Sequence, residues 1–326
     1  MSSLIPGFIS NLVGRSMTYD LLVFIGSFLI LMWAAGMLVT NLKKIANYFR
    51  LSNYVIAFIL MGFITSIPEF FIGISSALNK IPIYSFGNLI GANIANLGLV
   101  LGVAVLISRN LVVNKKMAKQ DAMYMLIVAI LPLILISDGL LSRADGIVLL
   151  GFFAFYITHL IYRGKRNGRE RKETSYKELL GNLVSLLISI YFLFLSSQML
   201  VSSGLSVSKE FGLPLILVGI FTAIGTTLPE LAFTLKSAPL YKGQMTLGNI
   251  IGSVVVNSSL ILGIVALIYP IAIANIFLVI ISSIFLVLFL FLFLIMSKTG
   301  EQITIHEGFI LLLLYIFFII ITYSMR

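Results

Sequence analysis

Residues 62–69 read GFITSIPE and residues 223–230 read AIGTTLPE, in a chain that is otherwise largely apolar. In each stretch a threonine precedes a glutamate by four residues, so on a helix the two side chains point the same way. A second hydroxyl residue follows each threonine. The two stretches therefore present matching candidate ligands: Thr65, Ser66 and Glu69 in the first, and Thr226, Thr227 and Glu230 in the second.

A proline stands directly before each glutamate. Pro68 and Pro229 cannot donate the backbone hydrogen bonds that the carbonyls of Ile64 and Gly225 would accept in a continuous helix, and their rings push those turns open. The sequence therefore predicts a broken helix at each motif. The freed carbonyl oxygens are further candidate ligands.

The composition indicates an all-α integral membrane protein. Hydrophobic residues make up 60% of the chain and charged residues only 10%, whereas soluble domains usually carry about 25% charged residues. Apolar runs of the length needed to span a bilayer, about 20 residues, predict ten transmembrane helices. These are expected at 20–41, 54–78, 83–107, 122–137, 145–162, 179–202, 214–238, 244–268, 272–296 and 308–325.

The two motifs belong to an internal repeat. Residues 54–103 align with residues 215–264 at a constant offset of 161 without a gap, and the identities fall mainly on polar and small residues. Because an odd number of spans separates the copies, the second enters the membrane from the opposite side. The sequence thus predicts inverted repeats with broken helices, the pattern of secondary transporters. We expect a first five-helix repeat at 1–162, a basic linker at 163–178 and a second repeat at 179–326.

A line of polar side chains follows each motif. Asn88, Ala92 and Asn96 recur every four residues, and Asn249, Ser253 and Asn257 repeat that spacing in the second half. Nearby glycines allow helices to approach closely. We therefore expect both helices to face the glutamates with amide or hydroxyl oxygens.

Of the twelve acidic residues, only Glu69 and Glu230 lie clearly within predicted spans. An acidic side chain at a helix centre costs about 2.5–3.5 kcal/mol, and no Lys or Arg in either span is placed to neutralise it. Either a proton or a bound cation must compensate. Carboxylate, hydroxyl, amide and carbonyl oxygens suit Ca²⁺, and two negative charges match one Ca²⁺ or two Na⁺. The chain has no Cys, and we expect no resident cofactor.

The distribution of basic residues predicts the orientation. If successive loops alternate sides, 17 of the 22 Lys and Arg residues fall on one side, which the positive-inside rule makes cytoplasmic. Both termini are then extracellular and the protein lies in the cell membrane. The basic linker is expected to touch lipid headgroups rather than nucleic acid, and the sequence does not indicate an oligomeric state.

The paired motifs resemble those of the cation/calcium antiporter superfamily, and most closely its prokaryotic sodium/calcium exchanger branch. Residues 64–69 with 87–96, and residues 225–230 with 248–257, match the family's two motifs. The resemblance implies exchange of Ca²⁺ for Na⁺ by alternating access, with the first and sixth helices sliding against the rest. It implies that Glu69 and Glu230 bridge the cation positions, and that the remaining ligands come from Thr65, Thr226, Ser66, Thr227, Ser253, Asn96, Asn257 and the carbonyls of Gly62 and Ala223.

Two departures from the family pattern leave alternatives open. Ala92 replaces a serine, which removes a hydroxyl from what the resemblance makes the inner sodium position, and Asn257 stands where some members carry aspartate. A proton-coupled calcium exchanger is therefore an alternative to sodium coupling. A passive cation channel is another, as is an intramembrane enzyme that uses the paired carboxylates as acid and base.

Overall fold

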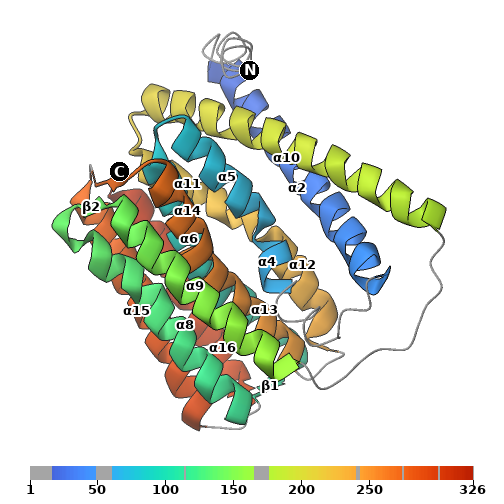
Figure 1. Cartoon of the computed structure of the whole chain (residues 1–326). Coiled ribbons are helices and arrows are strands. Elements are labelled where there is room, and N and C mark those ends of the chain that lie inside the picture. The colour runs from blue at the N-terminus through green and yellow to red at the C-terminus, as the bar shows by residue number, and fades with distance from the viewer. Residues whose placement is uncertain are drawn as a thin grey trace.

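The computed structural model describes residues 17–48, 61–113, 115–164, 176–239, 243–273, 275–299 and 302–325, which are almost entirely helical (Figure 1). The helices of the first half are α2 (Met17–Tyr48), α4 (Met61–Thr65), α5 (Ile67–Leu78), α6 (Pro82–Ala95), η2 (Asn96–Val100), α7 (Leu101–Ser108), α8 (Lys115–Leu135), η3 (Ile136–Asp138) and α9 (Arg143–Gly164). Those of the second half are α10 (Tyr176–Phe211), α11 (Leu215–Thr226), α12 (Leu228–Ser237), α13 (Gln244–Val255), η4 (Val256–Ile261), α14 (Leu262–Ile268), α15 (Ile276–Thr299) and α16 (Ile305–Ser324).

Eight helical segments of the described chain are long and apolar enough to cross a membrane. They correspond to eight of the ten predicted spans. The expected span at 145–162 coincides with the 22-residue helix α9. The span at 54–78 is described only from residue 61, as α4 and α5, and its first residues lie outside the described ranges. Most of the predicted linker, residues 165–175, also lies outside them.

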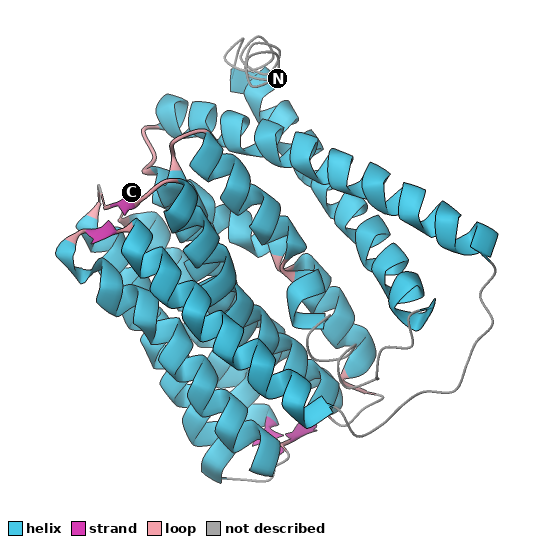
Figure 2. Cartoon of the chain, in the orientation of Figure 1, coloured by secondary structure: helices cyan, strands magenta, loops and turns pink. Residues whose placement is uncertain are grey.

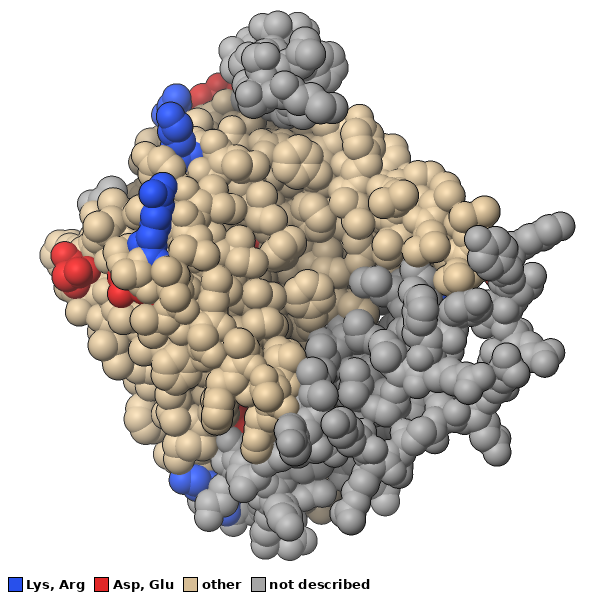
Figure 3. Space-filling model, in the orientation of Figure 1, with Lys and Arg blue, Asp and Glu red and all other residues tan. Residues whose placement is uncertain are grey.

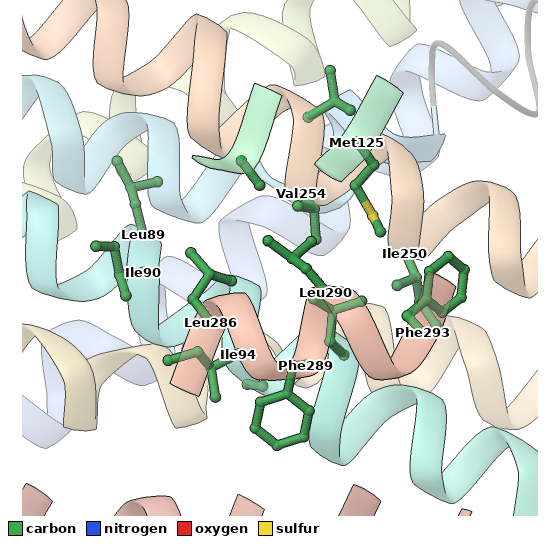
Figure 4. Packing of buried hydrophobic residues seen from close by; sticks show 14 of the residues in the cluster. Leu89, Ile90, Ile94, Met125, Ile250, Val254, Leu286, Phe289, Leu290 and Phe293 are labelled. Carbon is green, nitrogen blue, oxygen red and sulfur yellow. The ribbon is translucent and has the colours of Figure 1, made fainter. Parts of the chain in front are cut away.

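The long helices α2 and α10 lie side by side along one edge of the molecule (Figure 1). With parts of α4, α5 and α11 they form their own buried cluster, which includes Leu31, Leu193 and Leu200. The other helices pack around a larger core. Figure 4 shows Leu89, Ile90 and Ile94 of α6 in the same cluster as residues of α13 and α15.

Short strands join the two halves of the chain at separate places on the molecule (Figure 2). β1 (Asn110–Val112), which follows α7, pairs antiparallel with β4 (Gln302–Thr304). β3 (Ile271–Ala272), which follows α14, pairs antiparallel with β2 (Leu140–Leu141). β1 and β3 are equivalent strands of the two halves, because they start 161 residues apart. Each of them pairs with a strand of the opposite half.

Most charged side chains visible in Figure 3 gather near the ends of the helices, and the broad surface between them is largely uncharged. Large apolar side chains, such as Leu187, Phe277 and Leu313, are exposed on the described helices. An uncharged belt of exposed apolar side chains is what a bilayer solvates, so the molecule is a multi-pass membrane protein.

Candidate cation-binding site

Both predicted helix breaks are confirmed. α4 ends at Thr65 and α11 at Thr226, and each following helix begins one residue before its proline. The hinge residues Ser66 and Thr227 have nearly equal backbone angles, φ −83° and ψ 11° against φ −82° and ψ 0°. The two halves therefore break in the same way because each lacks the same proline N–H.

The breaks place one glutamate from each half in the interior. Glu69 and Glu230 lie in the first turns of α5 and α12, where a negative charge is favoured by the helix dipole. Both side chains are fully buried, and none of their four carboxylate oxygens has a hydrogen-bond partner among the described residues. Two buried carboxylates without hydrogen-bond partners are costly unless a cation or a proton compensates their charge.

The hydroxyl groups around these carboxylates come partly from the opposite half of the chain. Thr226 faces the Glu69 carboxyl, and Thr65 and Ser253 face that of Glu230, without meeting full hydrogen-bond geometry. Each glutamate is therefore faced by the threonine of the other motif. The equivalence of the two motifs in sequence did not reveal this exchange.

Two asparagines position the threonines in the same reciprocal manner. Thr65 Oγ1 donates a hydrogen bond to Asn249 Oδ1 at 3.1 Å, and Asn88 Nδ2 donates one to Thr226 Oγ1 at 3.3 Å. All four side chains are buried. Asn88 and Asn249 thus act as positioning residues, while Asn88 Oδ1 and Asn249 Nδ2 have no partner in the described part of the chain.

Ser253 joins the start of the first motif. Its Oγ lies 3.0 Å from Thr65 Oγ1 and 3.4 Å from the Gly62 carbonyl oxygen. The helices can approach here because Gly62 has no Cβ. A Cβ at this position would lie only 2.7 Å from the Gly252 Cα and carbonyl carbon. The predicted ligands Gly62, Thr65 and Ser253 are therefore brought together.

Ala92 occupies the position equivalent to Ser253 and lies at the other motif. It stands one turn after Asn88, which bonds Thr226, and the adjacent Gly91 packs directly against Ala223. The missing hydroxyl is thus lost beside Ala223 and Thr226, and not beside Gly62 and Thr65.

Asn96 and Asn257 are the first and second residues, respectively, of two π-helical segments that the sequence did not predict. Helices α6 and α13 widen into η2 and η4 at these residues. Single π turns inside helices often occur at functional sites. Both amide atoms of Asn96 and the Oδ1 of Asn257 are buried and lack a hydrogen-bond partner among the described residues.

A further asparagine, Asn93, was missed as a functional residue. Asn257 Nδ2 donates to Asn93 Oδ1 at 3.1 Å, and Asn93 Nδ2 donates to Ser258 Oγ at 2.8 Å. The repeat gave no signal for this residue because its counterpart in the second half is Val254. Asn93 fixes Asn257 so that its amide oxygen, rather than its nitrogen, remains available.

Ser66 and Thr227 differ despite their equal backbone conformation. The Ser66 hydroxyl is buried and has no partner in the described ranges. The Thr227 hydroxyl instead donates to the carbonyl oxygens of Ala223, at 2.9 Å, and Ile224, at 3.2 Å. Only the serine keeps its hydroxyl unengaged.

We call the convergent set the central polar cluster. Within the described residues no three His, Cys, Asp or Glu side chains gather in one place, so a cation here would be held by the two carboxylates and neutral oxygens. Such a donor set fits hard cations such as Ca²⁺. The cluster comprises Glu69, Glu230, Thr65, Thr226, Asn88, Asn249, Ser253, Ser66 and the start of each motif at Gly62 and Ala223. We add Asn96 and Asn257 to it because their segments η2 and η4 pack against α12 and α5, the helices that carry the glutamates.

Comparisons with known proteins agree with this architecture. The model of the sodium/calcium exchanger protein family matches residues 19–162 and again residues 181–324. The chain is 32% identical to an uncharacterized membrane protein of Methanocaldococcus jannaschii over 71% of this chain and 76% of that protein. It is 30% identical to the putative antiporter CaxA of Alkalimonas amylolytica, covering 74% and 78% of the two chains.

One similar protein spans almost the whole length. The sodium/calcium exchanger MaX1 of Methanosarcina acetivorans is 26% identical over 94% of this chain and 99% of its own. Among solved structures, the sodium-calcium exchanger NCX_Mj soaked with Na⁺ and Sr²⁺ matches with a TM-score of 0.63 and 27% identity, covering 91% and 96% of the two chains. The similar proteins that carry a functional description are transporters and not enzymes. The chain therefore belongs to the sodium/calcium exchanger family, in its prokaryotic branch.

Proposed function

We propose that this protein is a secondary antiporter that exchanges Ca²⁺ for Na⁺ across the cell membrane, with the ions bound between Glu69 and Glu230. The observation that carries the proposal is the pair of fully buried carboxylates, one from each half, whose four oxygens lack partners among the described residues. Two such charges in a membrane interior need compensation. One Ca²⁺ or two Na⁺ would supply it.

The surrounding oxygens support the choice of Ca²⁺ and Na⁺ as substrates. Ca²⁺ accepts about six to eight oxygen ligands in flexible geometry. The Thr65 and Ser253 hydroxyls beside Glu230 and the buried, unpartnered amide oxygen of Asn257 support this choice. NCX_Mj, a similar protein, has been studied in the presence of Na⁺ and Ca²⁺ or Sr²⁺.

We propose ten transmembrane helices in two inverted five-helix repeats. Reciprocal hydrogen bonds and strand pairs between the halves support this arrangement. The family model also matches the chain twice, over segments of equal length. The proposed units remain residues 1–162 and 179–326, joined by the basic linker at 163–178, with both termini extracellular.

Alternating access would require some helices to move past the cluster. We propose that α2 and α10 move together, since they pack along each other and share a buried cluster separate from the main core. Without bound cations, the two carboxylates would carry uncompensated charges in the membrane interior, which is costly. The empty carrier would therefore be unable to change between its outward-facing and inward-facing states. That penalty makes transport an exchange rather than a leak.

The test is Ca²⁺ uptake into proteoliposomes with an outward Na⁺ gradient, an outward H⁺ gradient or no gradient. We expect uptake only with the Na⁺ gradient, and none for Glu69→Gln. Glu210→Gln, at an exposed glutamate far from the cluster in sequence, is the matched control and should transport normally. Uptake driven only by H⁺ would identify a proton-coupled exchanger, and uptake without either gradient a channel.

A further inference from the structure

The two ends of the central polar cluster are not chemically equal. Each end consists of a backbone carbonyl and three side-chain positions related by the repeat. The Gly62 end comprises the Gly62 carbonyl, Thr65, Ser66 and Ser253, beside Glu230. The Ala223 end comprises the Ala223 carbonyl, Thr226, Thr227 and Ala92, beside Glu69.

The Gly62 end is rich in converging oxygens. Ser253 Oγ lies within 3.4 Å of both the Thr65 hydroxyl and the Gly62 carbonyl oxygen. The Ser66 hydroxyl is buried without a partner in the described ranges. Three hydroxyl oxygens and a carbonyl oxygen thus gather beside Glu230, where, within the described ranges, the Gly62 carbonyl accepts one bond, from Ser253.

The Ala223 end has fewer available oxygens. Ala92 is fully buried and supplies a methyl group where Ser253 supplies a hydroxyl. The Ala223 carbonyl oxygen already accepts hydrogen bonds from Thr227 N at 3.0 Å, Thr227 Oγ1 at 2.9 Å and Thr226 Oγ1 at 3.4 Å. A carbonyl oxygen has only two lone pairs, so little of it remains for a cation.

Assuming the proposed function, we infer that the Ala223 end does not hold Na⁺. The cluster then binds two Na⁺, one at the Gly62 end and one between the carboxylates, in place of one Ca²⁺. The amide of Asn257, which donates to Asn93, adds no charge to the two glutamates. Each cycle therefore exchanges two Na⁺ for one Ca²⁺ and moves no net charge across the membrane.

The lost sodium position faces outward in the proposed orientation. The predicted span at 214–238, which contains α11, begins on the extracellular side, whereas the predicted span at 54–78, which contains α4, begins on the cytoplasmic side. The Ala223 end is accordingly the outer one, although the sequence resemblance implied that Ala92 lies at the inner sodium position. The reason for the difference is that each motif is completed by the helix of the opposite half.

The experiment measures the steady-state Ca²⁺ accumulation ratio in proteoliposomes at a fixed Na⁺ gradient, with the membrane potential clamped at several values. One net charge per cycle would change this ratio about 50-fold per 100 mV. We expect no change for the wild-type protein, and two ²²Na⁺ moved per ⁴⁵Ca²⁺. A potential-dependent ratio in the wild-type protein would overturn the inference while leaving sodium/calcium exchange intact. Absence of sodium-driven uptake would instead refute the proposed function.

Two variants test whether the Ala223 end is responsible. Ala92→Ser restores the hydroxyl, and Ala92→Ser with Thr227→Ser matches the side chains of the Gly62 end. We expect the Ca²⁺ accumulation ratio of the double variant to change about 50-fold per 100 mV. The ratio of Ala92→Ser should depend on potential in the same direction but less steeply. Ala104→Ser, which adds the same oxygen to a buried position in α7, should stay independent of potential. A folded double variant that remains independent would overturn the assignment to this end.

Discussion

Thr65 and Asn249 are hydrogen-bonded at 3.1 Å although 184 residues separate them in the chain. The bond ties the broken helix of the first half to the intact helix of the second. The repeat-related residues form the reciprocal bond, in which Asn88 of the first half donates to Thr226 of the second half. The central polar cluster therefore exists only when both halves are folded against each other.

Asn249→Ala should weaken cation binding without removing a proposed ligand. It removes one of the hydrogen bonds of the buried Thr65 hydroxyl, at a cost of about 0.5–1.5 kcal/mol. We expect weaker Ca²⁺ binding in a titration of the purified protein, and Asn88→Ala should have a parallel effect through Thr226. A double-mutant cycle with Thr65→Val should give a coupling energy of about 0.5–3 kcal/mol. Additive effects of the two changes would contradict a positioning role.

Glu230→Gln should abolish Ca²⁺ uptake while leaving the protein at least as stable in the absence of cations. The substitution removes a buried charge whose insertion costs about 2.5–3.5 kcal/mol. Thermal unfolding in Ca²⁺-free and Na⁺-free buffer measures the stability, and proteoliposome uptake measures the activity. Normal transport by Glu230→Gln would show that this carboxylate is not part of the transport site.

Gly87→Ala should destabilise the contact between α6 and α11. An added Cβ would lie 2.9 Å from the Ile216 carbonyl carbon and closer still to its oxygen, so backbone would have to shift. Overpacking of this kind costs about 1–3 kcal/mol. Gly151→Ala is the matched control, since nothing lies within 4 Å of that position in α9. Equal melting temperatures for the two variants would contradict the close approach.

A disulfide between α5 and α10 should stop transport. The hydroxyls of Ser75 and Ser197 lie 2.6 Å apart, and the chain contains no native Cys to compete. If α10 slides past α5 in each cycle, oxidised Ser75→Cys/Ser197→Cys should be inactive and a reductant should restore uptake. Full activity of the cross-linked protein would show that these two helices do not move relative to each other.

Much of this architecture could be predicted from the duplicated motifs. The prolines predicted the helix breaks at Ser66 and Thr227. The position of Glu69 and Glu230 within apolar spans predicted that both side chains are buried. Equivalence between halves identifies which residues correspond, but it cannot say which of them touch. The exchange of partners between Thr65 and Thr226 therefore required the structure.

Other features had no pattern to reveal them. Asn93 lacks a polar counterpart in the second half. The π turns have no shared Gly or Pro signal either, since η2 contains Gly98 whereas η4 contains neither residue type. The direction of the Thr227 hydroxyl depends on whether it donates to a carbonyl of the preceding helix, as it does to Ala223, or points toward the central polar cluster. These local choices determine which oxygens remain available to a cation.

The most direct test of paired glutamates as the cation site is equilibrium binding of ⁴⁵Ca²⁺ to the purified protein. We predict one Ca²⁺ bound per chain, displaced by Na⁺, with binding lost in both Glu69→Gln and Glu230→Gln and retained in Glu210→Gln. Undiminished Ca²⁺ binding in either cluster variant, or binding that Na⁺ does not displace, would contradict a shared site between the two carboxylates.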